Sequence, residues 1–272
     1  MLSWNCFICV LFKLPKKMLT NIIEILILSL IQGISEFLPI SSSAHLVVVS
    51  SLYELKSSSL LIDVSLHLGS LLAIIFFFRK EFVDLKQNIK LLSLIIFGSI
   101  PLIVVGYILY KTELIYLLRD IKIIAWTTLI FGIILYFADK SKFNKSISSN
   151  LNLKTIFYIG LFQIVSLIPG VSRAGITITA ARLFKFNRFD SSKISFLLAI
   201  PALTGASTLS LIDVINKGFG LDYLVFIAIG LSFLSSYFTV KFFLTYINKY
   251  SLNVFVIYRI VVSIILFIII YI

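Results

Sequence analysis

Charged residues are scarce in this sequence of 272 residues: Asp, Glu, Lys and Arg together make up 13%, about half the share usual in a soluble domain. Hydrophobic residues make up 60%, and the mean hydropathy is +1.08. This composition excludes an ordinary soluble enzyme. Because apolar runs of membrane-spanning length recur from end to end, we expect an all-α polytopic membrane protein without a sizeable soluble domain.

Cysteine is equally scarce, since the chain holds only Cys6 and Cys9. Two cysteines exclude a disulfide framework, and no second ligand pair follows their C-x-x-C spacing, so we interpret that spacing as coincidence. The net charge of +12 would suggest nucleic acid as a partner of a soluble protein. Here the lysines fall in short loops between apolar runs, where they set topology beside anionic lipid. We therefore expect a lipid bilayer, and no nucleic acid, as partner.

Six apolar runs are long enough to cross a bilayer, which takes about 20 residues. Two further apolar segments are shorter, and each breaks inside a polar stretch, the first at Pro39 and the second at Pro169. We interpret these two segments as re-entrant helical hairpins, because proline ends a helix. The limbs are expected at 20–34 and 42–52 and at 154–168 and 172–186, and the spans at 60–78, 91–110, 121–138, 194–212, 221–243 and 254–271.

The two halves of the chain resemble each other. Matching residues lie 130 positions apart, namely Pro39 and Pro169, Tyr107 and Tyr237, and Lys111 and Lys241. Each half holds one hairpin and three spans, an odd number of crossings, so the second repeat must be inverted, and the site is expected where the two breaks meet. The expected division is an N-terminal extension (1–17), a first repeat (18–138), a cytoplasmic linker (139–153) and a second, inverted repeat (154–272).

Basic residues predict the orientation in the membrane. One set of loops carries ten lysines and arginines and the other set four, so the first set is expected in the cytoplasm and both termini outside. Lys13, Lys16 and Lys17 would violate this rule, and we therefore expect the true start at Met18. The basic loops are 79–90, 139–153, 187–193 and 244–253, and the others are 53–59, 111–120 and 213–220.

The first hairpin carries an acid, three hydroxyls and a histidine near its turn, where ionisable groups are costly and usually functional. A helix beginning near Ser42 would offer unpaired N–H groups and a positive dipole end to a phosphate. His45 lies one turn beyond Ser41 and Ser42 on the same face, so hydroxyl and imidazole could act as nucleophile and base, or as phosphate donor and general acid. Glu36 lies one turn after Gln32 and could hold a divalent cation or activate a nucleophile.

The second hairpin repeats this arrangement with different chemistry. We expect Ser172 to cap its second helix, Arg173 to supply a planar fork of donors to phosphate, and Gly170 to permit close backbone approach. Thr177 lies one turn beyond Arg173 on the same face. Two helix N-termini and an arginine predict a receptor for a highly charged anion, and the acid and histidine opposite suggest that the anion is also cleaved.

Each of these residues also has a plainer interpretation. Ser35 and Ser43 are expected to bond helix carbonyls or to hold helices together. Arg173 could pair with Glu36 for structural reasons alone. A lone histidine within a membrane is often simply packed and hydrogen-bonded, and His67 fits that description better than His45. The joint placement of polar residues at two related breaks favours function.

The hairpin motifs resemble those of the bacterial undecaprenyl-diphosphatases, also called bacitracin-resistance proteins. The family's first motif, approximately (E/Q)-G-x-T-E-F-L-P-x-S-S-T-G-H, is similar to residues 32–45, and its second, P-G-x-S-R-S-G-x-T, to residues 169–177. Residues 195–201 also look like a family signature. The similarity runs from about Met18 to the C-terminus.

The resemblance implies a multi-pass phosphatase of the bacterial plasma membrane, with its site facing outward. It would convert undecaprenyl diphosphate to undecaprenyl phosphate and inorganic phosphate, regenerate the lipid carrier for peptidoglycan precursors and oppose bacitracin. Matched by motif, Glu36 would be the essential acid beside a divalent cation (Mg²⁺ or Ca²⁺), and Ser42 the nucleophile or a phosphate ligand. His45 would be the general acid/base, and Arg173, helped by Ser172, would bind the diphosphate. The remaining expected substrate-binding residues are Gln32, Ser41, Ser43, Gly170 and Thr177.

The sequence departs from the family pattern in a few places. Gln32 stands where many members have glutamate, which weakens any scheme with two carboxylates, and Ala174 removes one phosphate donor. A transporter, such as a flippase for polyprenyl phosphate, stays open as the alternative, because inverted repeats with broken helices are typical of carriers. The sequence also leaves open a homodimer and the choice of Ser42 or water as nucleophile.

Overall fold

Helices joined by short loops form the chain, as a computed structural model shows for residues 16–42, 44–46, 49, 60–114, 118, 120–216 and 223–271. Cys6, Cys9, Ser43 and most of the N-terminal extension lie outside the described residues. The elements are α2 (Lys16–Ser35), α4 (Leu60–Phe77), α5 (Arg79–Val83), α6 (Leu85–Lys111), α7 (Ile121–Asp139), α8 (Ile147–Asn150), α9 (Leu153–Ile164), the 3₁₀ turn η2 (Val165–Leu167), α10 (Arg173–Leu183), α11 (Arg188–Asn216), α12 (Tyr223–Ile247) and α13 (Asn253–Tyr271).

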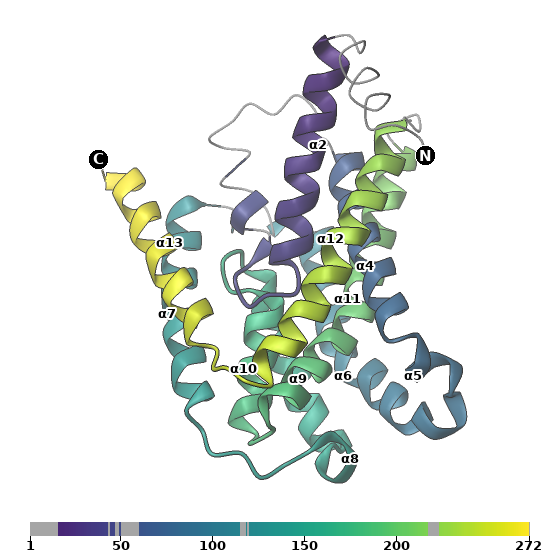
Figure 1. The fold of residues 1–272 in the computed structure, drawn as a ribbon, viewed down its shortest axis with the longest axis vertical. Coiled ribbons are helices and arrows are strands. Elements are labelled where there is room, and N and C mark those ends of the chain that lie inside the picture. Colours follow the sequence, from purple (N-terminus) through teal and green to yellow (C-terminus); the bar gives the residue numbers. More distant parts are fainter. Residues whose placement is uncertain are drawn as a thin grey trace, which may run out of the picture.

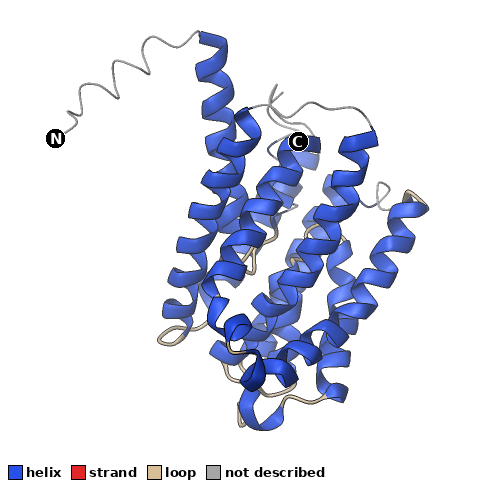
Figure 2. Cartoon of the chain, turned by 90° about the vertical axis from the view of Figure 1, so that its right-hand side faces the viewer, coloured by secondary structure: helices blue, strands red, loops and turns tan. Residues whose placement is uncertain are grey.

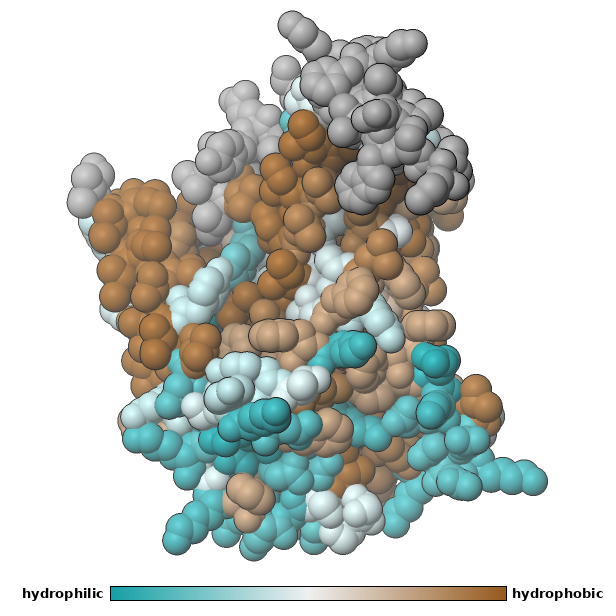
Figure 3. Space-filling view, in the orientation of Figure 1, coloured by the Kyte–Doolittle hydropathy of each residue, from teal (hydrophilic) through white to brown (hydrophobic). Residues whose placement is uncertain are grey.

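Six of these helices, α4, α6, α7, α11, α12 and α13, are long and apolar enough to cross a membrane, which confirms the six expected spans. The start of α2 and the end of α13 lie at one end of the molecule, and α5 and α8 lie at the other (Figure 1). In a side view the described part of the chain is drawn as helices and loops (Figure 2). Hydrophilic side chains gather at the α5 and α8 end, whereas the upper part of the same face is apolar (Figure 3). The long helices therefore present the apolar surface that a bilayer requires.

All four segments expected as cytoplasmic loops contain helix, and in the fourth, 244–253, α12 continues to Ile247. Residues 187–193 were predicted as a loop, but α11 begins at Arg188, because the Asn187 side chain accepts a hydrogen bond from the Asp190 N–H (2.8 Å). Residues 79–90 and 139–153 contain α5 and α8. Hydropathy marks only the apolar part of a helix, so these polar turns were missed.

The first limb of the first hairpin ends where it was predicted to end. It was expected over 20–34 with Pro39 as the terminating residue, and α2 ends at Ser35, one turn before the proline. The physical reason is that Pro39 has no N–H to donate to the Ser35 carbonyl, and its ring would collide with that carbonyl in a continued helix. Residues 36–40 form a turn instead, and this turn carries Glu36.

Small residues let the short limbs approach the spans closely. A Cβ atom added to Gly160 of α9 would lie 1.9 Å from the Gly98 carbonyl oxygen of α6. A Cβ added to Gly33 of α2 would lie 1.9 Å from the Ser235 hydroxyl of α12. Both hairpins are thus packed tightly against long helices, as small residues permit at membrane helix interfaces.

Candidate active site

Each hairpin turns through a serine with a left-handed backbone. Ser41 (φ 78°) precedes the helical turn that begins at Ser42, and Ser172 (φ 71°) precedes α10. Such backbone conformations are strained for residues other than glycine and cluster at functional sites. Ser172 is the expected N-cap, since its hydroxyl accepts a hydrogen bond from the Gly175 N–H (3.1 Å).

Gly170 brings the second turn against α7. Its φ is +89°, and an added Cβ atom would lie 2.1 Å from the Thr127 hydroxyl oxygen. The Thr127 hydroxyl also donates to the Pro169 carbonyl (2.7 Å). Gly170 therefore has the predicted role of allowing close backbone approach, with a helix rather than a ligand as the neighbour in this structure.

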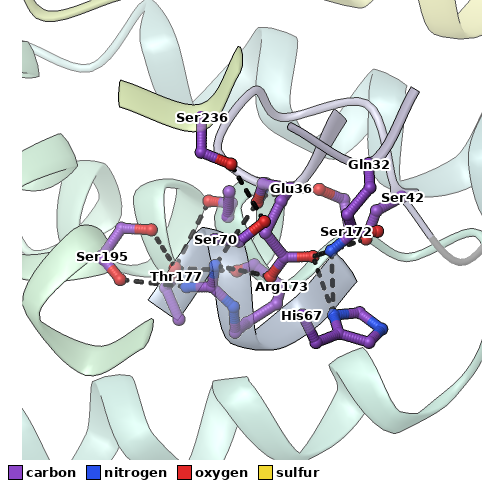
Figure 4. Close-up of polar contacts among 12 residues, drawn as sticks. Gln32, Glu36, Ser42, His67, Ser70, Ser172, Arg173, Thr177, Ser195 and Ser236 are labelled. Carbon is purple, nitrogen blue, oxygen red and sulfur yellow. Dashed lines mark hydrogen bonds and ion pairs between the residues drawn. The ribbon is translucent and has the colours of Figure 1, made fainter. Parts of the chain in front are cut away.

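An ion pair joins the two hairpins, which confirms that the polar stretches meet. Arg173 Nη2 lies 3.1 Å from Glu36 Oε1, and both side chains are buried, with 11% and 6% of their surface exposed (Figure 4). The same nitrogen donates to the Glu36 carbonyl oxygen (3.3 Å), and Nη1 donates to the Ser195 carbonyl oxygen (3.1 Å). The Nε–H group of Arg173 is buried and has no hydrogen-bond partner within the described part of the chain.

The other carboxylate oxygen of Glu36 accepts hydrogen bonds from polar side chains of the first hairpin. Glu36 Oε2 accepts hydrogen bonds from Ser42 Oγ (2.7 Å) and from Gln32 Nε2 (3.0 Å). Glu36 lies outside the six candidate spans. Burial alone would raise the pKa of Glu36, but the nearby Arg173 guanidinium and the hydrogen bond from Ser42 lower it below its usual value. A carboxylate held ionised beside a hydroxyl can act as the base that takes the hydroxyl proton.

His67 of α4 belongs to this site, although the sequence suggested a packing role. Its Nδ1 lies 2.8 Å from Gln32 Nε2 and 3.9 Å from Glu36 Oε2. Because Gln32 donates to Nδ1, the neutral ring carries its proton on Nε2, on the far side of the ring. The signal available in the sequence was an ionisable residue within an apolar span.

His45 is directed elsewhere. Its Nε2 lies 2.5 Å from the Tyr258 hydroxyl of α13, and its Nδ1 lies 2.6 Å from the carbonyl oxygen of Ser41. The one-turn relation predicted between Ser41 and His45 is therefore present, but through the backbone rather than through the hydroxyl. Both ring nitrogens have partners other than Ser42 and Glu36.

Thr177 links α10, which carries Arg173, to α11. Its hydroxyl oxygen lies 2.7 Å from the Arg173 carbonyl oxygen and 2.7 Å from Ser195 Oγ, and the residue is fully buried. Ser41 is buried as well. Thr177 therefore holds the first turn of α10 against α11.

A divalent cation would have a single carboxylate to bind. No group of three or more His, Cys, Asp or Glu side chains converges within the described residues. Gln32 Oε1, however, is buried and without a hydrogen-bond partner in the same part of the chain. An amide oxygen and one carboxylate suit a hard cation that takes its remaining ligands from substrate phosphates. Glu36 and Gln32 thus fit a cation that binds together with a phosphorylated substrate.

Comparisons with known proteins match nearly the whole chain. The family described as bacitracin resistance protein BacA matches residues 25–265. An undecaprenyl-diphosphatase of Pelagibacter ubique (strain HTCC1062) is 73% identical over 255 residues, which cover 93% of this chain and 100% of the relative. Proteins of the same name from Elusimicrobium minutum and Alteromonas mediterranea are 39% identical over 259 residues and 37% identical over 260 residues, covering 90% of this chain and 97% of each relative.

Proposed function

This chain belongs to the bacitracin resistance protein BacA family and is a phosphatase, and on that premise we propose that it hydrolyses undecaprenyl diphosphate to undecaprenyl phosphate and inorganic phosphate. The reaction would recycle the lipid carrier for peptidoglycan synthesis and confer bacitracin resistance. The observation that carries the proposal is the buried contact of Glu36 with Arg173 and Ser42, which joins a base, an anion ligand and a nucleophile.

Ser42 is the proposed nucleophile, because its hydroxyl already donates to Glu36 at 2.7 Å. Ser42 Oγ would attack the terminal phosphorus while its proton passes to Glu36. The bond from that phosphorus to the bridging oxygen would break, and Glu36 would return the proton to the leaving undecaprenyl phosphate. Water would then attack the phosphoserine with Glu36 as base, releasing inorganic phosphate and restoring the Ser42 hydroxyl.

Arg173 is the proposed ligand of the diphosphate. Its unpartnered Nε–H and the N-terminus of α10 provide donors for phosphoryl oxygens, and its charge would stabilise the transferring group. His67 would orient the Gln32 amide beside Glu36 through its Nδ1. A cation held by Glu36, Gln32 and the substrate would supply further neutralisation of the diphosphate charge.

We also propose that the fold consists of two inverted repeats in the bacterial plasma membrane, with the site facing outward. The packing pattern supports this, because α2 of the first half packs on α12 and α9 of the second half packs on α6, whereas α7 and α13 pack on each other. The two serine turns support it too, since Ser41 and Ser172 share a left-handed backbone. The hydrophilic α5 and α8 end would lie in the cytoplasm, as the excess of basic residues predicts.

The experiment that tests this function is phosphate release from undecaprenyl diphosphate by the purified full-length protein in lipid vesicles. We expect release that stops on chelation and returns with added Mg²⁺ or Ca²⁺. Binding of the lipid without phosphate release, or transport of the lipid without hydrolysis, would contradict the proposal.

The two histidines should differ in their effect on this assay. We expect His67→Ala to lower kcat by about 100-fold, because it releases the Gln32 amide that bonds Glu36. His45→Ala should lower kcat by less than about tenfold, since both nitrogens of His45 bond to protein groups. Steady-state kinetics of the two variants, with folding checked by gel filtration, decides the point; a larger loss for His45→Ala would return the acid/base role to His45.

A further inference from the structure

Arg259 is a fully buried arginine in the first half of α13. It interrupts an otherwise apolar run, and neither hairpin motif includes it. A buried charge within a membrane helix costs free energy unless its hydrogen bonds are satisfied, and such charges are usually functional. The hydrogen-bond partners of Arg259 indicate its role.

The guanidinium of Arg259 bonds backbone carbonyl oxygens from three segments. In the first hairpin its Nη1 donates to Pro39 O (3.2 Å). In the second hairpin Nη1 donates to Val171 O (3.0 Å) and Nη2 to Gly170 O (2.9 Å). Towards α7, Nε donates to Thr128 O (3.1 Å) and Nη2 lies 3.4 Å from Thr127 O. One planar group thus links the turns of both hairpins to α7.

The linked carbonyls lie next to the reacting groups in the chain. Pro39 is three residues from both Glu36 and Ser42, and Val171 is two residues before Arg173. The position of the guanidinium therefore sets the separation between the base and nucleophile of one hairpin and the anion ligand of the other. Side-chain contacts alone would have to set that separation if this link were absent.

We propose that Arg259 is the positioning residue that holds the two hairpins in register for phosphoryl transfer. Lysine cannot replace it, because three donors on one nitrogen cannot reach carbonyls on opposite sides as the five donors of a planar guanidinium do. Tyr258, the preceding residue, reinforces the link through its hydrogen bond to His45 in the first hairpin. Through these hydrogen bonds, α13 fixes the positions of the two hairpin turns.

Arg182 provides a matched control. It is also buried (1% exposed), and its guanidinium donates to the carbonyl oxygens of Phe186 (2.7 Å), Asp139 (2.7 Å) and Ser141 (2.8 Å). These contacts lie at the end of α10 remote from Ser172. Loss of Arg182 should therefore destabilise the fold in a similar way without moving the hairpin turns.

The inference rests on the proposed function, so the test begins from wild-type phosphate release. We expect Arg259→Lys to lower kcat by about 100-fold, the loss typical of a misplacement of about 1 Å, with KM changed less than about threefold. Arg182→Lys should lower the melting temperature similarly and change kcat by less than about twofold. If the wild type releases no phosphate, the proposed function fails. If the wild type is active and the two lysine variants have equal kcat, this inference fails.

A coupling measurement separates positioning from general destabilisation. Arg259→Lys should already displace Arg173. In that background the fold reduction in kcat caused by Arg173→Lys should be less than about a tenth of the fold reduction that it causes in the wild-type background. In the Arg182→Lys background the cost of Arg173→Lys should be unchanged. If Arg173→Lys lowers kcat by the same factor in the Arg259→Lys background as in the wild type, the proposal is overturned.

A gentler variant keeps the test valid if Arg259→Lys does not fold. A Cβ atom added to Gly132 would lie 3.2 Å from Arg259 Cβ and 3.4 Å from its Nε, so Gly132→Ala should displace the guanidinium slightly. Gly230→Ala is the control, because a Cβ atom there meets nothing within 4 Å. We expect kcat of Gly132→Ala to fall about fivefold relative to Gly230→Ala. Equal kcat values would overturn the proposal.

Discussion

Glu36→Gln protein should fold and bind undecaprenyl diphosphate, but release phosphate about 10³-fold more slowly than the wild type. Glutamine has nearly the shape of glutamate and can still contact Ser42 and Arg173, yet it cannot take up the Ser42 proton. The substitution also leaves the buried Arg173 guanidinium without its counter-charge, so the free energy of unfolding should fall by about 3 kcal/mol. Phosphate release under single-turnover conditions and thermal unfolding, both in the same lipid vesicles, measure the two effects.

Glu81→Gln is the matched control for this substitution. Glu81 pairs with Lys193 (2.7 Å) at the α5 end, away from the hairpins, so the same chemical change should alter kcat by less than about twofold. Release by Glu36→Gln within about tenfold of the wild type would show that Glu36 is not the base. Ser42 would then need another proton acceptor.

Arg173→Met should lower phosphate release at least as much, with kcat reduced about 10³-fold or more. The transferring phosphoryl group gathers charge on its oxygens, and an arginine aimed at that charge is worth about 10³ to 10⁵ in kcat in other phosphoryl-transfer enzymes. Arg173→Lys should recover part of the rate, because it keeps the charge but loses the planar fork. Kinetics of the two variants against diphosphate concentration separate weaker binding from slower chemistry.

Arg188→Lys is the control for Arg173. Arg188 forms a two-point contact with Asp139 (2.7 and 2.9 Å), which lies beside Arg182 in the last turn of α10, remote from Ser172, so its replacement should affect stability more than kcat. The double variant Glu36→Gln/Arg173→Met should unfold at a higher temperature than either single variant, since it leaves no unpaired buried charge, and yet remain inactive. A double variant less stable than both single variants would contradict the ion pair described here.

The membrane class and the six spans were predictable because they depend on properties that lie along the chain. Apolar length and composition determine which segments can enter a bilayer, whatever their neighbours are. The N-cap at Ser172 and the break near Pro39 were predictable for the same reason, since capping and proline act within one turn. The helical start of α11 at Arg188 was missed because its first residues are polar and hydropathy does not register them.

The site itself was predictable only as two groups of residues that should meet. The motifs at the two hairpins identified Glu36, Ser42 and Arg173, and the structure brings these three side chains together. The sequence also offered the plain ion pair of Arg173 with Glu36, and the structure contains it. In a site that binds a phosphate, the ion pair between Glu36 and Arg173 also holds the base and the anion ligand in position for the substrate.

Three contacts of the site could come only from the folded chain. Gln32 meets His67 across a separation of 35 residues, His45 meets Tyr258 across 213, and Arg259 meets the first hairpin across 220. Local hydropathy, capping and one-turn spacing carry no information over such separations. The packing of α4 and α13 around the hairpins directs His45 away from Glu36, brings His67 towards it and places Arg259 between the two turns.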